Sequence, residues 1–205
     1  MNIEVTGLGK KFQRNWIFRN LDYHFQSSKS YAVTGHNGSG KSTFLQVLVG
    51  FIPANEGDVA FKKDDAVITP EESIIHFDII TPYLELVEEF TLDEFLNFHF
   101  KFKSLKTGFS IDDFVEKIYL TKDRDKEIKY YSSGMKQRLK LGLGLFSKSS
   151  VLLLDEPTTN LDEQGTQWYL ENIKEVLNEK LVIISSNQKH EYEFCVEVIN
   201  IPDYK

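Results

Sequence analysis

Cysteine and long apolar runs are nearly absent from this sequence. Cys195 is the only cysteine among 205 residues, so no internal disulfide can form and we expect a reducing compartment. Its neighbours Phe194 and Val196 are apolar, which favours a buried thiol over a reactive one. No apolar run approaches the roughly 18 residues of a membrane span. The segment Met1–Glu4 has neither the basic nor the apolar region of a signal peptide. We therefore expect a soluble, intracellular protein.

An excess of basic residues is also missing. The chain carries 24 Lys and Arg against 31 Asp and Glu, which gives a formal net charge of −7. Nucleic-acid binding needs a basic surface that neutralises phosphates, so we expect no nucleic-acid partner. The same balance argues against electrostatic anchoring on acidic lipids, but a membrane-protein partner stays compatible with it. The length and the hydrophobic content of 41% fit one globular domain, or a core with an inserted subdomain.

The segment 35–43 reads Gly-His-Asn-Gly-Ser-Gly-Lys-Ser-Thr, the pattern of a phosphate-binding loop. It follows the short apolar run Ser30–Thr34 and precedes a helical pattern, which disfavours a glycine-rich turn that contains Lys-Ser by chance. Glycines let backbone N–H groups approach phosphate oxygens, and the new helix directs its positive end at the same anion. Lys41 would reach the β- and γ-phosphates, and the Ser42 hydroxyl would bind Mg²⁺. The residues predicted to hold the nucleotide here are Gly35, Asn37, Gly38, Ser39, Gly40, Lys41, Ser42 and Thr43.

Two carboxylates follow a second apolar run, Val151–Leu154. Asp155, at the strand end, is predicted to hold Mg²⁺ through water, opposite Ser42. Glu156 is predicted to polarise a water molecule for in-line attack on the γ-phosphorus, as a general base. Carboxylates at a strand end can also cap a helix. Beside a phosphate loop, the catalytic interpretation is favoured.

The segment 131–138, Tyr-Ser-Ser-Gly-Met-Lys-Gln-Arg, opens a further helix with Ser132 and Gly134 at its tip. A helix start of this kind can bind an anion, and it can equally be an ordinary N-cap. Gly142 and Gly144 lie inside the same helix, where each costs about 1 kcal/mol relative to alanine. We therefore expect close packing against this helix to compensate.

Strand-like and helix-like stretches alternate along the chain, which predicts an α/β core with a parallel sheet. A stripe of apolar residues at helical spacing predicts a helix over 167–180. The expected strands are Tyr31–Thr34, Ile74–Ile80, Val151–Leu154, Leu181–Ser185 and Val196–Ile201.

The middle of the chain, from about Tyr83 to Phe146, is rich in phenylalanine and has helical patterns. Thr91 and Glu94 form a capping box, and a second helix starts at Ser110. We expect a helical subdomain inserted into the α/β core. The apolar stripe of its first helix is predicted to face the core and consists of Leu92, Phe95, Leu96 and Phe102.

Together these motifs resemble the ATP-binding cassette (ABC) family of ATPases, in order and in spacing, over essentially the whole chain. The segment 131–135 is the discriminating one, because other phosphate-loop proteins lack it. The resemblance implies a single domain over 1–205 with a P-loop NTPase core of mostly parallel sheet, a small antiparallel β part at the N-terminus and an inserted helical subdomain. We expect the core over about 1–82 and 147–205 and the helical subdomain over about 83–146.

The resemblance also implies a head-to-tail dimer, with each ATP between the phosphate loop of one subunit and the signature segment of the other. By motif match, Ser132 and Gly134 would contact the partner's γ-phosphate, and the D-loop Asn160–Asp162 would line the interface. An aromatic residue near the N-terminus usually stacks on adenine in this family. Phe12 is the expected residue, with Trp16 as the alternative.

Three positions depart from the family pattern. The signature segment reads Tyr-Ser-Ser-Gly-Met over 131–135 in place of Leu-Ser-Gly-Gly-Gln. Tyr83 stands at the position of a glutamine that ends the strand before the helical subdomain, and it offers no amide oxygen to Mg²⁺. Asn187 stands at the position of a switch histidine that contacts the γ-phosphate, and it cannot carry a proton. His190 follows nearby and is expected to face elsewhere.

The resemblance implies the ATPase subunit of an ABC transporter, which binds ATP and Mg²⁺, dimerises with a second such subunit, most simply as a homodimer, and drives integral membrane permease subunits. It would lie in the cytoplasm, peripheral on the inner face of the cell membrane.

Two alternatives stay open. One is a soluble ABC ATPase of repair or translation, which the missing coiled coil, the single cassette and the acidic balance disfavour. The other is a weakly hydrolysing regulatory subunit, which Asn187 and Tyr83 favour and Glu156 disfavours. The expected permease-docking groove is lined by Tyr83, Leu84, Leu86, Val87 and Phe90.

Overall fold

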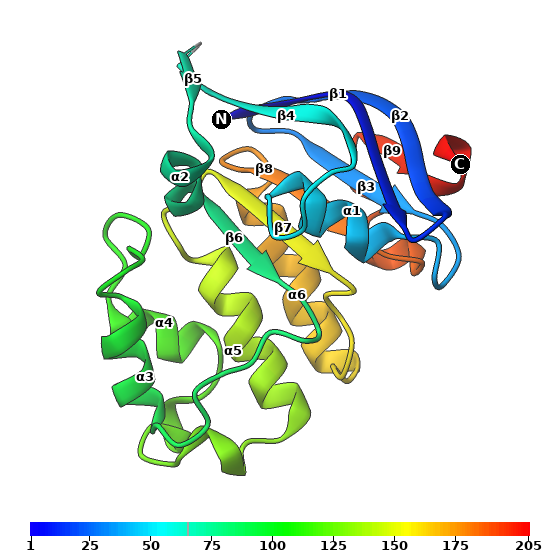
Figure 1. The fold of residues 1–205 in the computed structure, drawn as a ribbon. Coiled ribbons are helices and arrows are strands. Elements are labelled where there is room, and N and C mark those ends of the chain that lie inside the picture. Colours follow the sequence, from blue (N-terminus) through cyan, green and yellow to red (C-terminus); the bar gives the residue numbers. More distant parts are fainter. Residues whose placement is uncertain (65) are drawn as a thin grey trace.

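The computed structural model describes residues 1–64 and 66–205 (Figure 1). A five-stranded sheet has the order β6-β7-β8-β3-β9, and each neighbouring pair is parallel. Its strands are β3 (Ser30–Thr34), β6 (Phe77–Ile80), β7 (Val151–Asp155), β8 (Leu181–Ser185) and β9 (Glu197–Asn200). Every residue of β7 and β8 is buried, because helices or a second sheet cover both faces. This burial explains why continuous apolar runs predicted these strands.

Two of the predicted strands are longer than the strands observed. Ile74–His76 form the 3-10 turn η1, and β6 begins only after it. The Ile74 and Ile75 side chains are 61% and 64% exposed, so the apolar run extends beyond the part of the segment that pairs in the sheet. At the C-terminal end, Ile201 belongs to the 3-10 turn η5 (Ile201–Tyr204), not to β9.

A second, antiparallel sheet packs over helix α1 (Lys41–Leu48), as Figure 1 shows. Phe44 of α1 contacts Phe18 and Phe25 with ring centroids 5.6 and 6.3 Å apart. The apolar cluster around Phe44 draws residues from both sheets. The expected combination of a parallel core sheet and an N-terminal antiparallel part is confirmed. This second sheet has the order β2-β1-β4-β5 and consists of β1 (Asn2–Phe12), β2 (Asn15–Phe25), β4 (Glu56–Lys63) and β5 (Ala66–Ile68).

Apart from the one-turn helix α2 (Pro70–Ser73), which lies before β6 and beside β5, the remaining helices cover the other face of the parallel sheet and extend away from it. Figure 1 shows α3 and α4 beside α5, at the opposite end of the molecule from the antiparallel sheet. The helices are α2 (Pro70–Ser73), α3 (Leu92–His99), α4 (Ile111–Lys117), α5 (Ser133–Leu145) and α6 (Glu163–Val176), with 3-10 turns η2 (Thr121–Asp123), η3 (Ile128–Tyr130) and η4 (Lys189–Glu191).

The helix starts follow local capping chemistry. The predicted capping box of Thr91 and Glu94 opens α3, and Ser110 and Asp113 form a second one at α4. The helix expected over 167–180 instead spans Glu163–Val176, because the Asp162 side chain caps it from outside by accepting a hydrogen bond from the Gly165 N–H at 2.7 Å.

The apolar stripe predicted for the first helix of the helical part is wrong at one residue. Leu92, Phe95 and Leu96 are buried as expected, but Phe102 is 71% exposed. The cause is the end of α3 at His99, which breaks the helical spacing before Phe102. Phe102 instead packs edge-on against Phe98 at the surface.

Close packing against α5 is confirmed at both of its interior glycines. A Cβ on Gly142 would lie 2.6 Å from Cγ2 of Ile118, and one on Gly144 would lie 2.6 Å from Cδ1 of Leu152. Ile118 follows α4 and Leu152 lies in β7. The two glycines therefore let α5 approach the helical layer on one side and the sheet on the other.

Cys195 is half-buried and packs against the apolar cluster on the helical face of the sheet. Burial raises the pKa of its thiol from 9.0 to about 12, which makes the thiol unreactive at neutral pH, as expected. Within residues 1–64 and 66–205, no helix has the length and apolar character that crossing a membrane requires.

Candidate nucleotide-binding site

The phosphate loop connects β3 to α1, and its backbone requires glycine. Gly35, Gly38 and Gly40 have φ of 143°, 77° and 107°. A Cβ on Gly40 would lie 2.1 Å from Cγ2 of Ile17, and one on Gly35 would lie 2.5 Å from Oγ of Ser39. Helix α1 starts directly after Gly40 and has no acidic residue in its first turn. The loop therefore brings backbone N–H groups and a positive helix end to one place.

Lys41 lies inside the loop that it is predicted to serve. Its side chain is nearly buried, and Nζ donates hydrogen bonds to the carbonyl oxygens of Gly35, at 3.0 Å, and His36, at 3.4 Å. Two backbone carbonyls thus hold the ammonium group beside the loop N–H groups. Phosphate oxygens can replace these carbonyls as acceptors, with stronger charge-assisted bonds.

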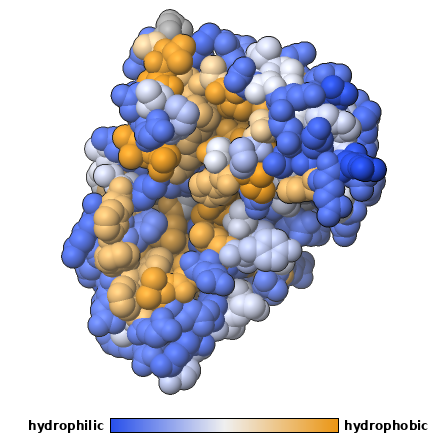
Figure 2. All heavy atoms as spheres, in the orientation of Figure 1, coloured by the Kyte–Doolittle hydropathy of each residue, from blue (hydrophilic) through white to orange (hydrophobic). Residues whose placement is uncertain are grey.

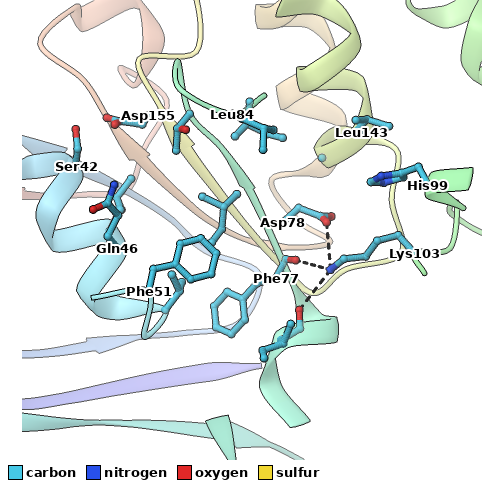
Figure 3. A pocket seen from close by; sticks show the side chains of 17 residues that line it. Ser42, Gln46, Phe51, Phe77, Asp78, Leu84, His99, Lys103, Leu143 and Asp155 are labelled. Carbon is cyan, nitrogen blue, oxygen red and sulfur yellow. Dashed lines mark hydrogen bonds and ion pairs between the residues drawn. The ribbon is translucent and has the colours of Figure 1, made fainter. Parts of the chain in front are cut away.

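Ser42 and Asp155 line the same end of one cleft, as Figure 3 shows. Asp155 ends β7 and is almost fully buried, and its Oδ1 has no hydrogen-bond partner among the described residues. A buried carboxylate oxygen without a partner fits a hard cation, which takes oxygen ligands. No three His, Cys, Asp or Glu side chains cluster in the described ranges. Mg²⁺ at this place would therefore depend on Ser42, Asp155, nucleotide phosphates and water.

Glu156 follows Asp155 in a left-handed backbone conformation, with φ of 45°. Its N–H donates to the carbonyl of Ser185 at 2.8 Å, so the loop after β7 stays bonded to the end of β8. The side chain is only partly buried. A positive φ in a residue other than glycine is strained and is common at functional sites.

Asn187 lies against the phosphate loop. Its Nδ2 donates a hydrogen bond to Oδ1 of Asn37. The segment after β8 and the loop after β3 therefore meet at the carboxyl end of the parallel sheet. His190, in contrast, directs Nε2 at the Thr158 hydroxyl, 3.4 Å away, so it faces a different loop.

The signature segment lies apart from the phosphate loop, at the start of α5 in the lower part of Figure 1. Ser132 is the N-cap of α5, and its Oγ accepts a hydrogen bond from the Met135 N–H at 3.2 Å. Gly134 packs on the D-loop, since a Cβ on it would lie 3.2 Å from the carbonyl oxygen of Asn160. Ser132, Gly134 and Asn160 line a depression that shares no lining residue with the Ser42–Asp155 cleft.

The two aromatic candidates for adenine stacking differ in how much of the ring surface is open for stacking. Phe12 is 48% exposed at the end of β1, and Nζ of Lys10 lies 5.0 Å from its ring centroid. Trp16 has two cations over its ring, Lys11 at 4.9 Å and Arg19 at 4.6 Å. Its ring also packs closely on Gly9. Phe12 is therefore the ring with more surface available to a base.

The Ser42–Asp155 cleft has a volume of about 350 Å³ and continues between α1, β6 and α3. Figure 2 shows apolar side chains around this hollow. Of the residues expected to form a docking groove, Leu84 lines it, whereas Leu86 is buried and Tyr83 is 84% exposed outside it. Its apolar walls were not foreseen. They include Leu45, Val49, Phe51, Ile74 and Phe77.

Thr81 and Gln46 also line the cleft and were missed by the sequence analysis. Thr81 follows β6 directly, so its place at a strand end was a usable signal. Gln46 lies one turn after Ser42 on α1, on the same side of the helix.

Comparison with known proteins gives one consistent family. Residues 18–159 match the family model described as ABC transporter. The uncharacterized ABC transporter ATP-binding protein YybJ of Bacillus subtilis (strain 168) is 30% identical over 201 residues, with 92% of this chain and 87% of that protein covered. The linearmycin resistance ATP-binding protein LnrL of the same organism is 28% identical over 206 residues. That match covers 98% of this chain but 66% of LnrL, so the chain spans about two thirds of that relative.

Solved structures share the fold. A putative ABC transporter ATP-binding protein from Pyrococcus furiosus superposes with a TM-score of 0.81 at 18% identity, and each chain is covered completely. A dimeric post-hydrolysis state of the ATP-binding cassette MJ0796, bound to ADP and Pi, gives 0.80 at 17% identity, with 97% of this chain and 93% of that chain covered. With the phosphate loop, the strand-end carboxylates and the signature segment in place, the chain belongs to the ABC transporter family and carries its ATP-binding, ATP-hydrolysing domain.

Proposed function

We propose that this chain is the ATPase subunit of an ABC transporter, which dimerises on MgATP and drives separate integral membrane permease subunits. The observation that carries the proposal is the division of the chemistry between two faces. One face holds the phosphate loop and the buried carboxylate of Asp155, whose Oδ1 has no hydrogen-bond partner in the part of the chain that the structure describes. Ser132 and Gly134 belong to another. The first face has no signature residue, and the second has no phosphate loop. The signature segment of a second copy of the chain would therefore complete the site.

In this proposal Lys41 and the loop N–H groups hold the β- and γ-phosphates. Ser42 and Asp155 hold Mg²⁺, which would neutralise phosphate charge when bound. Gly35, Asn37, Gly38, Ser39, Gly40 and Thr43 complete the cradle, and Phe12 stacks on adenine. Glu156 removes a proton from the attacking water. Asn187, held at the loop by Asn37, donates a neutral hydrogen bond toward the γ-phosphate.

The partner's Ser132 and Gly134 would close the site over the γ-phosphate, most simply in a homodimer. The apolar cleft that starts at Ser42 and Asp155 would receive a permease segment, so the subunit would lie at the inner face of the cell membrane. Its continuity with the predicted Mg²⁺ position supports this placement. We also propose the division into a core over about 1–82 and 147–205 and a helical subdomain over about 83–146.

Glu156→Gln tests the proposal. The amide keeps the size of the side chain but cannot accept a proton from water, so we expect ATP binding to persist, turnover to cease and an ATP-bound dimer to accumulate. Size-exclusion chromatography with saturating MgATP and steady-state phosphate release measure both effects. Glu179→Gln, an exposed change outside the site, is the matched control.

Ser132→Arg in the Glu156→Gln background tests the trans arrangement, because a bulky cation at the start of α5 should prevent closure. A Glu156→Gln protein that binds MgATP but stays monomeric would contradict the model. Purification from a membrane extract tests the permease partner, which should co-purify with the wild-type chain.

A further inference from the structure

Glu191 is a buried carboxyl group at the meeting point of two loops of the site. It ends η4, and its side chain is 0% exposed. Its Oε1 accepts hydrogen bonds from the Thr158 N–H, at 2.8 Å, and from the Thr158 hydroxyl. Burying a carboxyl group is costly unless it is hydrogen-bonded. The pair therefore fixes η4 and the loop that contains Thr158 against each other.

Thr158 belongs to the loop that carries Glu156. The carbonyl of Pro157, between them, accepts a hydrogen bond from Nε2 of Gln137 at 2.8 Å. Gln137 is buried in α5, the helix that begins with the signature segment. Buried side chains thus hold the strained Glu156 loop from two directions, α5 through Gln137 and η4 through Glu191.

The turn η4 also follows Asn187 closely in the chain. The Glu191 N–H donates to the carbonyl of Gln188 at 3.0 Å, and the Glu191 carbonyl accepts the hydroxyl of buried Tyr169 at 3.1 Å. Asn187 itself is bonded to Asn37 of the phosphate loop. Glu191 therefore connects the segment of the γ-phosphate contact to the segment of the general base.

Only one oxygen of Glu191 makes this connection. Oε2 is buried and has no hydrogen-bond partner among the described residues. Thr158 needs an acceptor at the Oε1 position, and a glutamine supplies one there. The negative charge itself is not required for the contact.

We propose that Glu191 is a positioning residue for ATP hydrolysis, which holds Thr158 and thereby sets Glu156 in place relative to Asn187 and the phosphate loop. The inference rests on the proposed role of Glu156 as the general base. Glu191 lines neither the Ser42–Asp155 cleft nor the signature depression. Its loss should lower turnover and leave nucleotide affinity nearly unchanged, because the phosphate loop does not depend on the Thr158 contact.

The test compares Glu191→Ala, Glu191→Gln and Thr158→Val in the full chain. We expect Glu191→Ala to lower kcat at least about tenfold, since small displacements of a catalytic group are costly. KM and the Kd for MgATP should stay within about threefold of wild type. Glu191→Gln keeps the acceptor and should restore kcat to within about threefold. Glu193→Gln, an exposed change two positions on, is the matched control.

Thr158→Val removes only the hydroxyl and decides the question if Glu191→Ala does not fold; it should lower kcat with affinity intact. If the kcat of Glu191→Ala equals that of the Glu193→Gln control, the positioning role is overturned. The same holds if Glu191→Ala loses affinity for MgATP by the same factor as it loses kcat. A wild-type protein without ATPase activity would instead overturn the proposed function and this inference with it.

Discussion

At the scale of single residues, the candidate site combines residues that match the family motif with one, Asn187, that departs from it. Lys41 and Ser42 begin the helix after the glycine-rich loop, Asp155 ends β7, and Oδ1 of Asp155 has no hydrogen-bond partner among the described residues. Asn187 lies at the phosphate loop through its bond to Asn37, yet an amide cannot take up a proton. The altered residue should therefore limit the rate of hydrolysis and not the binding of nucleotide.

We predict that Asn187→His accelerates basal ATP hydrolysis about fivefold. A charge-assisted hydrogen bond to the developing negative charge is stronger than a neutral one by about 1 kcal/mol. Steady-state phosphate release at saturating MgATP measures the change. Asn187→Ala should be slower than wild type, and Gln188→Ala, an exposed neighbour, is the control. An Asn187→Ala protein with the wild-type rate would show that this residue is outside the reaction.

At the scale of elements, helix α5 lies between the parallel sheet and the helical layer and contacts both. Its N-terminus carries Ser132, and its interior glycines contact the helical layer and the sheet. Gln137 extends the same helix to the loop after β7 through the Pro157 carbonyl. The position of α5 therefore affects both the signature segment and the loop that carries Glu156.

We predict that Gly142→Ala destabilises the protein by about 1–3 kcal/mol, although alanine favours helix by about 1 kcal/mol. The new methyl group would lie 2.6 Å from Ile118 Cγ2 and 3.1 Å from Phe114 Cζ. Urea denaturation measures the loss. Removing the obstructing atom with Ile118→Ala should make the double variant more stable than additivity predicts. Purely additive effects would contradict steric overlap as the cause.

The sequence predicted those elements whose signals are local. The phosphate loop, the capping box at Thr91 and the strand β8 were placed from contiguous residues. The start of β6 was missed, because Ile74 and Ile75 are apolar but exposed. The contact between Glu191 and Thr158 could not be predicted, because the two residues lie 33 positions apart and only the fold brings them together.

At the scale of the whole molecule, a buried polar network ties together four segments that are distant in sequence. Asp78 of β6 lies 3.4 Å from Nζ of Lys103, as Figure 3 shows. It also accepts hydrogen bonds from the hydroxyls of Ser147 and Ser149. Lys180, just before β8, donates to the carbonyls of Gly144 and Ser147 at 2.8 and 2.9 Å. The network joins the sheet to the segment after α3 and to the end of α5.

This network makes stability depend on pH in the alkaline range. Burial lowers the pKa of Lys180 from 10.5 to about 8, and nearby Asp78 opposes the shift. Since the folded pKa is below the unfolded one, the unfolded state binds more protons between these values. The free energy of unfolding should therefore rise with pH through this window, by about 1 kcal/mol from pH 8 to pH 9.

Urea denaturation of wild type and Lys180→Met between pH 7 and 9.5 measures this contribution. The methionine variant loses the hydrogen bonds at every pH, so the comparison concerns the slope alone. The difference between the two proteins should change by about 1 kcal/mol from pH 8 to pH 9. Lys174→Met, at an exposed position of α6, should follow wild type. Parallel curves for wild type and Lys180→Met would refute the assignment.

The central strands divide their side chains between two apolar clusters. Leu152 and Leu154 of β7 point to the helical side, and Val151 and Leu153 point to the side of α1 and the antiparallel sheet. A change of volume at one position shifts the strand, and the strand transmits that shift to the opposite cluster. A substitution in β7 must therefore fit the packing of both clusters. A substitution that compensates for a change in one cluster can lie in the other cluster, at a residue that does not contact the altered side chain.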